Sequence, residues 1–479
     1  MEDKRGSWGS NFGFLMAAIG SAVGLGNIWG FPYKMGKGGG FAFLLIYILC
    51  VIFIGFGVML GELALGRKTG SSAVGTYAYF SKNHKWIGYL GVVSAFVILA
   101  FYSVLGGLVM RYMVGFMLQL LGLDGFSGQG LGFFGSFLFD YGGMLFFFAL
   151  FVYMNVAIVS GGIEEGIEKF TVYGMPALFF LLIFVAVYVA FQPGAIEGYK
   201  YMFKPNFDVF KEPGGFFNVL KLAAGQMFFS LSLGMGAMIT YGSYLSKEAN
   251  LQRNAFIIPI ADTIMALLAG CAVMPACAAF GIDYGGGPGL LFVSMQTAFT
   301  KMGTFGNFVG MTFYFLVLIA AITSSISLLE VCVSYYVDKK LKEGKDVNRT
   351  NVVLVCAALA FVVGLPVALD ALGSGGAAVK APFEILGMTI GDASTGYRTW
   401  NDCWLDFYDM ISEGVFMPLG AILMSLLIGW KYKTKTIYDE CEIGGYTFKG
   451  KAFFDICFKY VIPVGVAFVL YSQIRDFFG

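Results

Sequence analysis

Charged residues are scarce in this sequence. Asp, Glu, Lys and Arg together make up 13% of the 479 residues, whereas 58% of the residues are hydrophobic, and the net charge is only +1. This composition excludes an ordinary soluble domain, and a nearly neutral chain lacks the basic surface that binds nucleic acid. The sequence therefore predicts a protein that crosses a membrane many times and has the lipid bilayer as its main partner.

Histidine and paired cysteines are also lacking. His84 is the only histidine, and none of the eight cysteines belongs to a C-x-x-C pair. These absences argue against a zinc site, a haem attachment site and a disulfide framework. The sequence has no G-x-S-x-G motif and no paired set of catalytic carboxylates either. We therefore expect that the protein is not an enzyme.

Long apolar stretches recur along the chain. A helix needs about 20 apolar residues to cross a bilayer, and glycine, proline and charged residues separate eleven windows of that kind. We expect an all-α polytopic membrane protein with spans near residues 11–33, 41–66, 87–118, 142–160, 167–192, 216–241, 254–281, 305–337, 351–370, 403–430 and 453–474.

Lysine and arginine are distributed unevenly between the two sides of this arrangement. Most of the 31 Lys and Arg residues fall on the side of the N-terminus, including Lys4, Arg5 and the cluster at 339–349. Positive residues near membrane spans stay on the cytoplasmic side. The pattern predicts a cytoplasmic N-terminus and, with eleven spans, a C-terminus outside the cell.

Two spans contain residues that interrupt a helix. The stretch from Phe14 to Tyr33 has four glycines and Pro32 but no charge, and the stretch from Ala223 to Tyr241 has a G-M-G sequence at 234–236. Backbone that leaves a helix inside a bilayer must be satisfied by protein, water or ligand. Paired interrupted helices in the two halves of a chain indicate the substrate site of a transporter. The alternative is that these small residues only let helices pack closely.

Polar groups inside the spans give a second indication of function, because they are costly in lipid. Asp262 has apolar residues for a full turn on either side, so a carboxylate there needs a cation or a proton. Glu62, Glu330 and the hydroxyl run at 323–327 have the alternative explanation of hydrogen bonds within or between helices.

Three motifs resemble the signature sequences of one transporter family. GSAVGLGNIWGFPY, GQMFFSLSLGMGAMITYGSY and AAITSSISLLE occur in the order and at nearly the offsets found in the neurotransmitter:sodium symporters. The chain resembles the bacterial eleven-span branch, which carries amino acids across the inner membrane. The resemblance implies one transmembrane domain over 1–479 with a leucine-transporter-like fold. In that fold two inverted five-helix repeats (11–192 and 216–430) have spans one and six broken mid-membrane, and a further span follows at 453–474.

The same resemblance implies two sodium sites and no chloride requirement. The first sodium site would be formed by the substrate carboxylate and by Ala22, Asn27, Ser230 and Asp262. The second would be formed by the carbonyls of Gly20, Val23 and Ala320 and the hydroxyls of Thr323 and Ser324. Chloride-dependent relatives have an amide at the position of Asp262, whose carboxylate supplies the negative charge here.

The substrate pocket implied by the resemblance suits an α-amino acid. Relatives that carry amines without a carboxylate have an aspartate at the position of Gly24, and Met235 would give an adaptable apolar wall for a hydrophobic or aromatic side chain. The implied lining residues are Ser21, Ala22, Leu25, Gly26, Ile98, Tyr102, Phe229, Ser230, Ser232, Met235, Ser324 and Leu328.

The gates implied by the resemblance include one departure from the family pattern. Gly30 stands where relatives have the arginine of the outer gate, although its acidic partner, Asp409, is present, and Lys34 and Lys37 are candidate substitutes. The implied inner gate consists of Arg5, Trp8, Ser243, Tyr244 and Asp338, and the implied outer gate consists of Tyr102, Phe229 and Asp409.

The sequence thus predicts sodium-coupled symport of an α-amino acid into the cell by alternating access. The alternatives are a sodium-coupled transporter of another small zwitterion, an ion channel, whose filter also uses carbonyls and hydroxyls, and a sensor that binds an amino acid without moving it. Nothing in the sequence indicates an oligomeric state.

Overall fold

The computed structural model describes residues 6–126, 130–284, 289–374, 376–387 and 402–478. Within these residues the chain is helical throughout, with turns between the helices and no strand. Two spans are interrupted: α1 (Asn11–Ala22) is followed by η2 (Gly26–Gly30) and α2 (Phe31–Lys37), and α11 (Gly215–Ser230) is followed by α12 (Ala237–Gly242).

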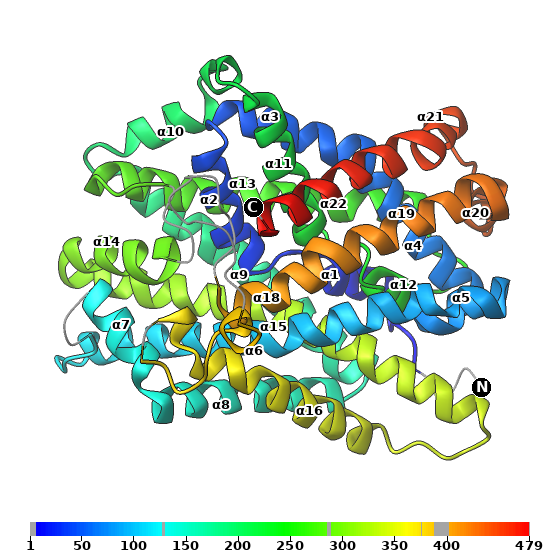
Figure 1. The fold of residues 1–479 in the computed structure, drawn as a ribbon, viewed down its shortest axis with the longest axis horizontal. Coiled ribbons are helices and arrows are strands. Elements are labelled where there is room, and N and C mark those ends of the chain that lie inside the picture. The colour runs from blue at the N-terminus through cyan, green and yellow to red at the C-terminus, as the bar shows by residue number, and fades with distance from the viewer. Residues whose placement is uncertain (1–5, 127–129, 285–288, 375, 388–401, 479) are drawn as a thin grey trace.

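The remaining long helices follow the predicted windows closely (Figure 1). They are α3 (Phe41–Cys50) running into α4 (Phe56–Thr69), α6 (Lys85–Leu120), α8 (Tyr141–Ser160), α9 (Lys169–Ala190), α13 (Leu251–Phe280), α15 (Gly303–Lys342), α16 (Arg349–Leu369), α18 (Trp404–Asp409) running into α19 (Met417–Leu426), and α21 (Lys451–Ile456) running into α22 (Ile462–Phe478). Short helices connect them: α5 (Ala73–Phe80), α7 (Leu131–Phe139), α10 (Ala195–Phe203), α14 (Gln296–Lys301), α17 (Pro382–Ile385) and α20 (Lys435–Glu442).

Nine helical stretches in the described part of the chain are long and apolar enough to cross a membrane. The bent pair α1 and η2–α2, with an angle of 50° between its halves, makes a tenth. α11 and α12, on either side of the non-helical segment 231–236, correspond to the remaining predicted span. The all-helical membrane fold expected from the sequence is therefore confirmed.

α15 occupies the centre of the bundle. The most apolar window of α15 is entirely buried, whereas only 28% of the corresponding window of α8 is buried. α15 packs along α6 and also contacts α9 and α16, and Figure 1 shows α6 and α15 crossing the middle of the molecule. A central helix normally has apolar residues on all sides. The buried hydroxyls of Thr323 and Ser324 on α15 therefore indicate a polar site at this place.

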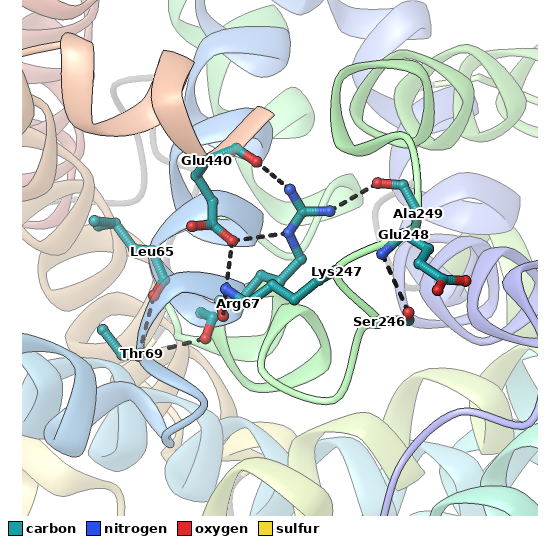
Figure 2. A network of polar contacts seen from close by, with 9 residues as sticks. Leu65, Arg67, Thr69, Ser246, Lys247, Glu248, Ala249 and Glu440 are labelled. Atoms are coloured by element: carbon teal, nitrogen blue, oxygen red, sulfur yellow. Dashed lines mark hydrogen bonds and ion pairs between the residues drawn. The ribbon is translucent and has the colours of Figure 1, made fainter. Parts of the chain in front are cut away.

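A buried charge network joins three segments at one end of the bundle (Figure 2). Arg67, near the end of α4, donates from Nε to Glu440 of α20 at 3.0 Å and from Nη1 to the Ala249 carbonyl at 2.7 Å. Lys247, in the segment after α12, donates to the same Glu440 carboxylate at 2.7 Å. The Arg67 and Glu440 side chains are 0% and 3% exposed, so each charge depends on the other for neutralisation.

Glu440→Gln is expected to lower the free energy of unfolding by about 3 kcal/mol, because it leaves the buried Arg67 charge without its carboxylate. Unfolding of the purified protein in a denaturing detergent series measures this change. Glu442→Gln is the matched control, because Glu442 lies on the same helix and pairs with the half-exposed Lys451. That control should change stability by less than about 1 kcal/mol. Equal effects of the two substitutions would show that the network does not stabilise the fold.

Candidate functional site

The first break begins where α1 ends. Val23 has an extended backbone (φ −78°, ψ 100°), which stops the helix. Gly24 follows in a very confined position, because a Cβ atom there would lie 2.7 Å from the Tyr102 hydroxyl oxygen and against the Ser324 hydroxyl. The freed Leu25 N–H donates to the Tyr102 hydroxyl at 3.0 Å. Only glycine therefore allows α6 and α15 to approach the break this closely.

The second break requires left-handed backbone. Ser232 has φ 53° and Gly234 has φ 82°, and a non-glycine residue such as Ser232 adopts this conformation only at a cost. The Gly234 N–H donates to a carboxylate oxygen of Glu62 at 2.6 Å. Glu62, one of the buried carboxylates singled out in the sequence, thus holds the interrupted segment between α11 and α12.

The two breaks meet at one cavity. The Ser232 hydroxyl donates to the Ser21 carbonyl at 2.9 Å, which joins the second break to the first. All the predicted substrate residues except Leu25 line this cavity. Leu25 donates its backbone N–H to the Tyr102 hydroxyl, and Gly24 lines the cavity instead. The lining residues are Ser21, Ala22, Gly24, Gly26, Ile98, Tyr102, Phe229, Ser230, Ser232, Met235, Ser324 and Leu328.

The cavity is narrow, with a free volume of about 20 Å³. This is room for about one water molecule, so any larger molecule that binds must displace side chains. The Phe229 ring packs over Gly26, where a Cβ atom would lie 2.6 Å from the ring. Met235, in the segment between α11 and α12, is unbranched and adapts readily to a changed neighbour.

Asp262 of α13 is the charged centre next to this cavity. It is fully buried, and its carboxylate accepts hydrogen bonds from Asn27 Nδ2 at 2.7 Å, from Ser230 Oγ at 2.9 Å and from the Tyr47 hydroxyl at 3.3 Å. The other end of the Asn27 amide accepts from the Gly24 N–H at 3.0 Å. Three of the four residues predicted for the first sodium site are thus in direct contact, and Ala22 lines the adjoining cavity.

The residues predicted for the second sodium site are also close together. The Ser324 hydroxyl lies 3.3 Å from the Gly20 carbonyl oxygen and 3.4 Å from that of Val23. The Thr323 hydroxyl lies 3.0 Å from the Ala320 carbonyl oxygen. Carbonyl and hydroxyl oxygens are ligands suited to a hard monovalent cation. No carboxylate belongs to this set, so it presents neutral oxygens only.

The residues just before α1 pack against aromatic side chains of the sixth span and the segment after it. Trp8 Nε1 donates to the Tyr241 carbonyl at 3.0 Å, and the Trp8 ring packs edge-on against the rings of Tyr241 and Tyr244. Tyr244 in turn donates to Glu330 at 2.7 Å. Of the other predicted inner-gate residues, Ser243 donates to the Thr240 carbonyl at 2.5 Å, Asp338 accepts from the Ser72 N–H at 2.6 Å, and Arg5 lies outside the described residues.

Lys34, which lies near the cavity residue Phe229, interacts with two acidic residues. The Lys34 ammonium lies 5.8 Å from the centre of the Phe229 ring and interacts electrostatically with Glu413 and Asp409. One carboxylate oxygen of Asp409 has no hydrogen-bonding partner among the described residues. Lys34, one turn after Gly30 on the same span, is therefore a basic residue that interacts with Asp409.

Sequence reasoning missed two residues that complete the site. Tyr47 reaches Asp262 from α3, and Gln226 of α11 donates from Nε2 to the Gly26 carbonyl at 2.8 Å. Both are fully buried polar residues within apolar helices. Buried polar groups require partners, and this requirement was the only signal in the sequence. It does not reveal which residue is the partner.

Comparisons with known proteins point in one direction. A model of the sodium:neurotransmitter symporter family matches residues 5–122 and 116–391. The chain is 33% identical over 480 residues to the uncharacterized sodium-dependent transporter YhdH of Bacillus subtilis (strain 168), covering 99% of this chain and 98% of that protein. An uncharacterized sodium-dependent transporter of Haemophilus influenzae is 31% identical over 489 residues, covering 98% of each chain.

A solved structure of a similar protein has the same fold. The crystal structure of MhsT in complex with L-phenylalanine matches with a TM-score of 0.82 and 34% identity, covering 98% of this chain and 100% of that one. This likeness confirms the predicted leucine-transporter-like architecture, with its broken first and sixth spans.

Proposed function

Because the chain belongs to the sodium:neurotransmitter symporter family and is a sodium-dependent, multi-pass membrane transporter, we propose that it carries an α-amino acid into the cell together with sodium. The cargo has a hydrophobic or aromatic side chain. The observation that carries this proposal is the meeting of two broken spans beside the buried carboxylate of Asp262.

The cargo class is supported by the chemistry at Gly24 and around it. With no side chain at Gly24, the first break carries no fixed negative charge of its own, which suits a cargo carboxylate. Ile98, Met235 and Leu328 form the apolar side of the cavity, and they suit an apolar side chain of the cargo. The bound L-phenylalanine in the similar MhsT structure agrees with this choice.

Coupling follows from shared ligands at the first sodium site. Asn27, Ser230 and Asp262 supply protein oxygens, and we assign the remaining ligands to the Ala22 carbonyl and the carboxylate of the cargo. The carboxylate of the cargo then completes the ion's coordination, and the ion offsets the negative charge of that carboxylate. Each therefore binds more tightly when the other is present. The fixed charge of Asp262 makes chloride unnecessary.

The second sodium site uses the α15 hydroxyls and the carbonyls of the first break. Thr323→Val is expected to raise the sodium concentration for half-maximal uptake about tenfold, because the variant keeps the side-chain shape but loses an oxygen that contacts a cation. Uptake measured over a sodium series gives this value. Ser325→Ala is the matched control, because the Ser325 hydroxyl donates to Asn155 of α8 instead. A normal sodium dependence in Thr323→Val would refute the assignment.

Alternating access would use the two closures at the ends of the cavity. We assign the inner closure to Trp8, Ser243, Tyr244 and Asp338 together with Arg5, and the outer closure to Tyr102 and Phe229 with Asp409. Lys34 replaces the outer arginine of relatives. We also propose repeat boundaries at 11–192 and 216–430, the additional span at 453–474, a cytoplasmic N-terminus and an external C-terminus.

Uptake into proteoliposomes tests the proposed function. Purified protein is reconstituted, an inward sodium gradient is imposed, and the twenty amino acids and matched decarboxylated amines are supplied with and without chloride. We expect accumulation of hydrophobic or aromatic amino acids in both salt conditions. Uptake of the amines but not of the amino acids would refute the cargo class. Ion flux without any solute requirement would indicate a channel, and binding without accumulation would indicate a sensor.

A further inference from the structure

A second cavity lies away from the transport pathway, between α11 and α22. Its free volume is about 450 Å³, far larger than that of the central cavity and within the usual range for small-molecule sites. The start of α11 and the end of α22 meet here, and Figure 1 shows the C-terminal end of α22 close to α11. The lining residues are Pro213, Gly214, Phe217, Asn218, Lys221, Phe468, Tyr471, Ser472 and Arg475.

The inner wall of this cavity is polar and positively charged. Lys221 is 8% exposed and forms an ion pair with Asp476, which leaves two of its three N–H donors without a partner among the described residues. Arg475 also pairs with Asp476, at 3.5 Å, through one of its nitrogens. Two cations therefore share one carboxylate, and the cavity has a net positive charge.

Two neutral polar groups in the wall lack protein partners. In the described part of the chain, neither the Asn218 amide nor the Ser472 hydroxyl has a hydrogen-bonding partner, although Ser472 is only 4% exposed. Asn218 is partly exposed and neither polar group is sealed off from solvent, so both can donate to a molecule in the cavity. Together with the free donors of Lys221, these groups are suited to an oxyanion that accepts several hydrogen bonds.

The rim of the cavity is aromatic and faces away from the bundle. Phe217 and Tyr471 are 59% and 64% exposed, and the Phe217 ring lies 5.8 Å from that of Phe468. Aromatic residues with this exposure at the end of a membrane span are typical of the lipid interface. The cavity therefore opens where the headgroups and upper acyl chains of lipids lie, which favours a lipid over a soluble anion.

We propose that this cavity binds the phosphate of an anionic phospholipid. Lys221 and Arg475 contact the phosphate oxygens, Asn218 and Ser472 donate to the headgroup, and the upper acyl chain lies against Phe217 and Tyr471. Lysine and arginine form strong charge-assisted hydrogen bonds with phosphate oxygens. The proposal concerns a site separate from the central cavity, so it does not depend on the identity of the cargo.

Native mass spectrometry of the full chain purified in detergent tests the proposal. Phosphatidylglycerol and phosphatidylcholine with identical acyl chains are titrated against the wild type and the Arg475→Gln variant. We expect the wild type to bind phosphatidylglycerol about tenfold more tightly, and we expect Arg475→Gln to lose that preference because it removes a charge-assisted hydrogen bond. Lys211→Gln is the matched control, since Lys211 is a solvated cation outside the cavity, paired with Asp208. It should bind as the wild type does.

A second variant tests the neutral part of the cavity, and a soluble competitor distinguishes a lipid from a soluble anion. Asn218→Leu keeps the charge of the cavity and is expected to weaken phosphatidylglycerol binding severalfold, the loss of one hydrogen bond. Equal binding of the two lipids by the wild type would overturn the proposal, as would an unchanged preference in both cavity variants. Displacement of the lipid by millimolar glycerol phosphate would instead identify a site for soluble anions, and it would also overturn the lipid assignment.

Discussion

Asp262→Asn is expected to reduce sodium-driven uptake in chloride-free medium by about 100-fold or more. Asp262 is completely buried, and it is the only formal negative charge that the protein contributes to the proposed first sodium site. Removing one partner of a buried charge pair costs about 3 to 5 kcal/mol, and every 1.4 kcal/mol corresponds to tenfold in affinity. Initial uptake rates in proteoliposomes, with and without chloride, measure the effect.

The Asp262→Asn variant also tests whether the Asp262 carboxylate replaces chloride. Chloride-dependent relatives have an amide at this position, so added chloride should restore part of the lost uptake. Asp370→Asn is the control, because Asp370 is equally buried but accepts from the Leu372 and Trp404 N–H groups at the end of α16. Full uptake by Asp262→Asn in the absence of chloride would mean that no sodium ion depends on this carboxylate.

Gly24→Ala is expected to weaken cargo binding by about 5- to 150-fold, the 1 to 3 kcal/mol typical of overpacking in a tight interior. The new Cβ atom would lie 2.7 Å from the Tyr102 hydroxyl oxygen and against the Ser324 hydroxyl. It would disturb the Leu25–Tyr102 hydrogen bond and move Ser324 relative to the carbonyls of the first break. Equilibrium binding of radiolabelled cargo at saturating sodium gives the affinity.

Gly132→Ala is the matched control for this change. A Cβ atom at Gly132 would meet no other atom within 4 Å, so that variant should bind cargo with unchanged affinity. Wild-type affinity in Gly24→Ala would show that the break is not as confined as the structure indicates, and that cargo does not bind against it.

The broken spans could be predicted from the sequence because their cause is local. Glycine, Asn27 and Pro32 within an uncharged window oppose a continuous helix whatever surrounds them. Periodicity does not fix the register of a residue inside such a break, since it applies only to helices. The family resemblance places Leu25 in the substrate pocket, whereas the structure brings only its backbone N–H to Tyr102 and has Gly24 among the lining residues.

Contacts between distant segments could not be predicted in the same way. Arg67 and Glu440 are separated by 373 positions, and neither lies in a sequence motif from which the other could be predicted as its partner. Tyr47 and Gln226 each lie in an apolar helix, where the sequence shows that a buried polar group needs a partner but not which element supplies it. The sequence offers Asp409 and Lys34 as candidate partners, but only the structure shows that Glu413 of η10 (Met410–Phe416) also interacts with Lys34.

The central claim is that a sodium ion and the cargo are held together where the two broken spans meet. Equilibrium binding of the transported amino acid to the purified full-length protein, measured in sodium and in potassium at equal ionic strength, tests this claim most directly. We predict binding in sodium only, and we predict that saturating cargo lowers the half-saturating sodium concentration by the same factor by which sodium raises cargo affinity. Equal cargo affinity in potassium and in sodium would contradict the account.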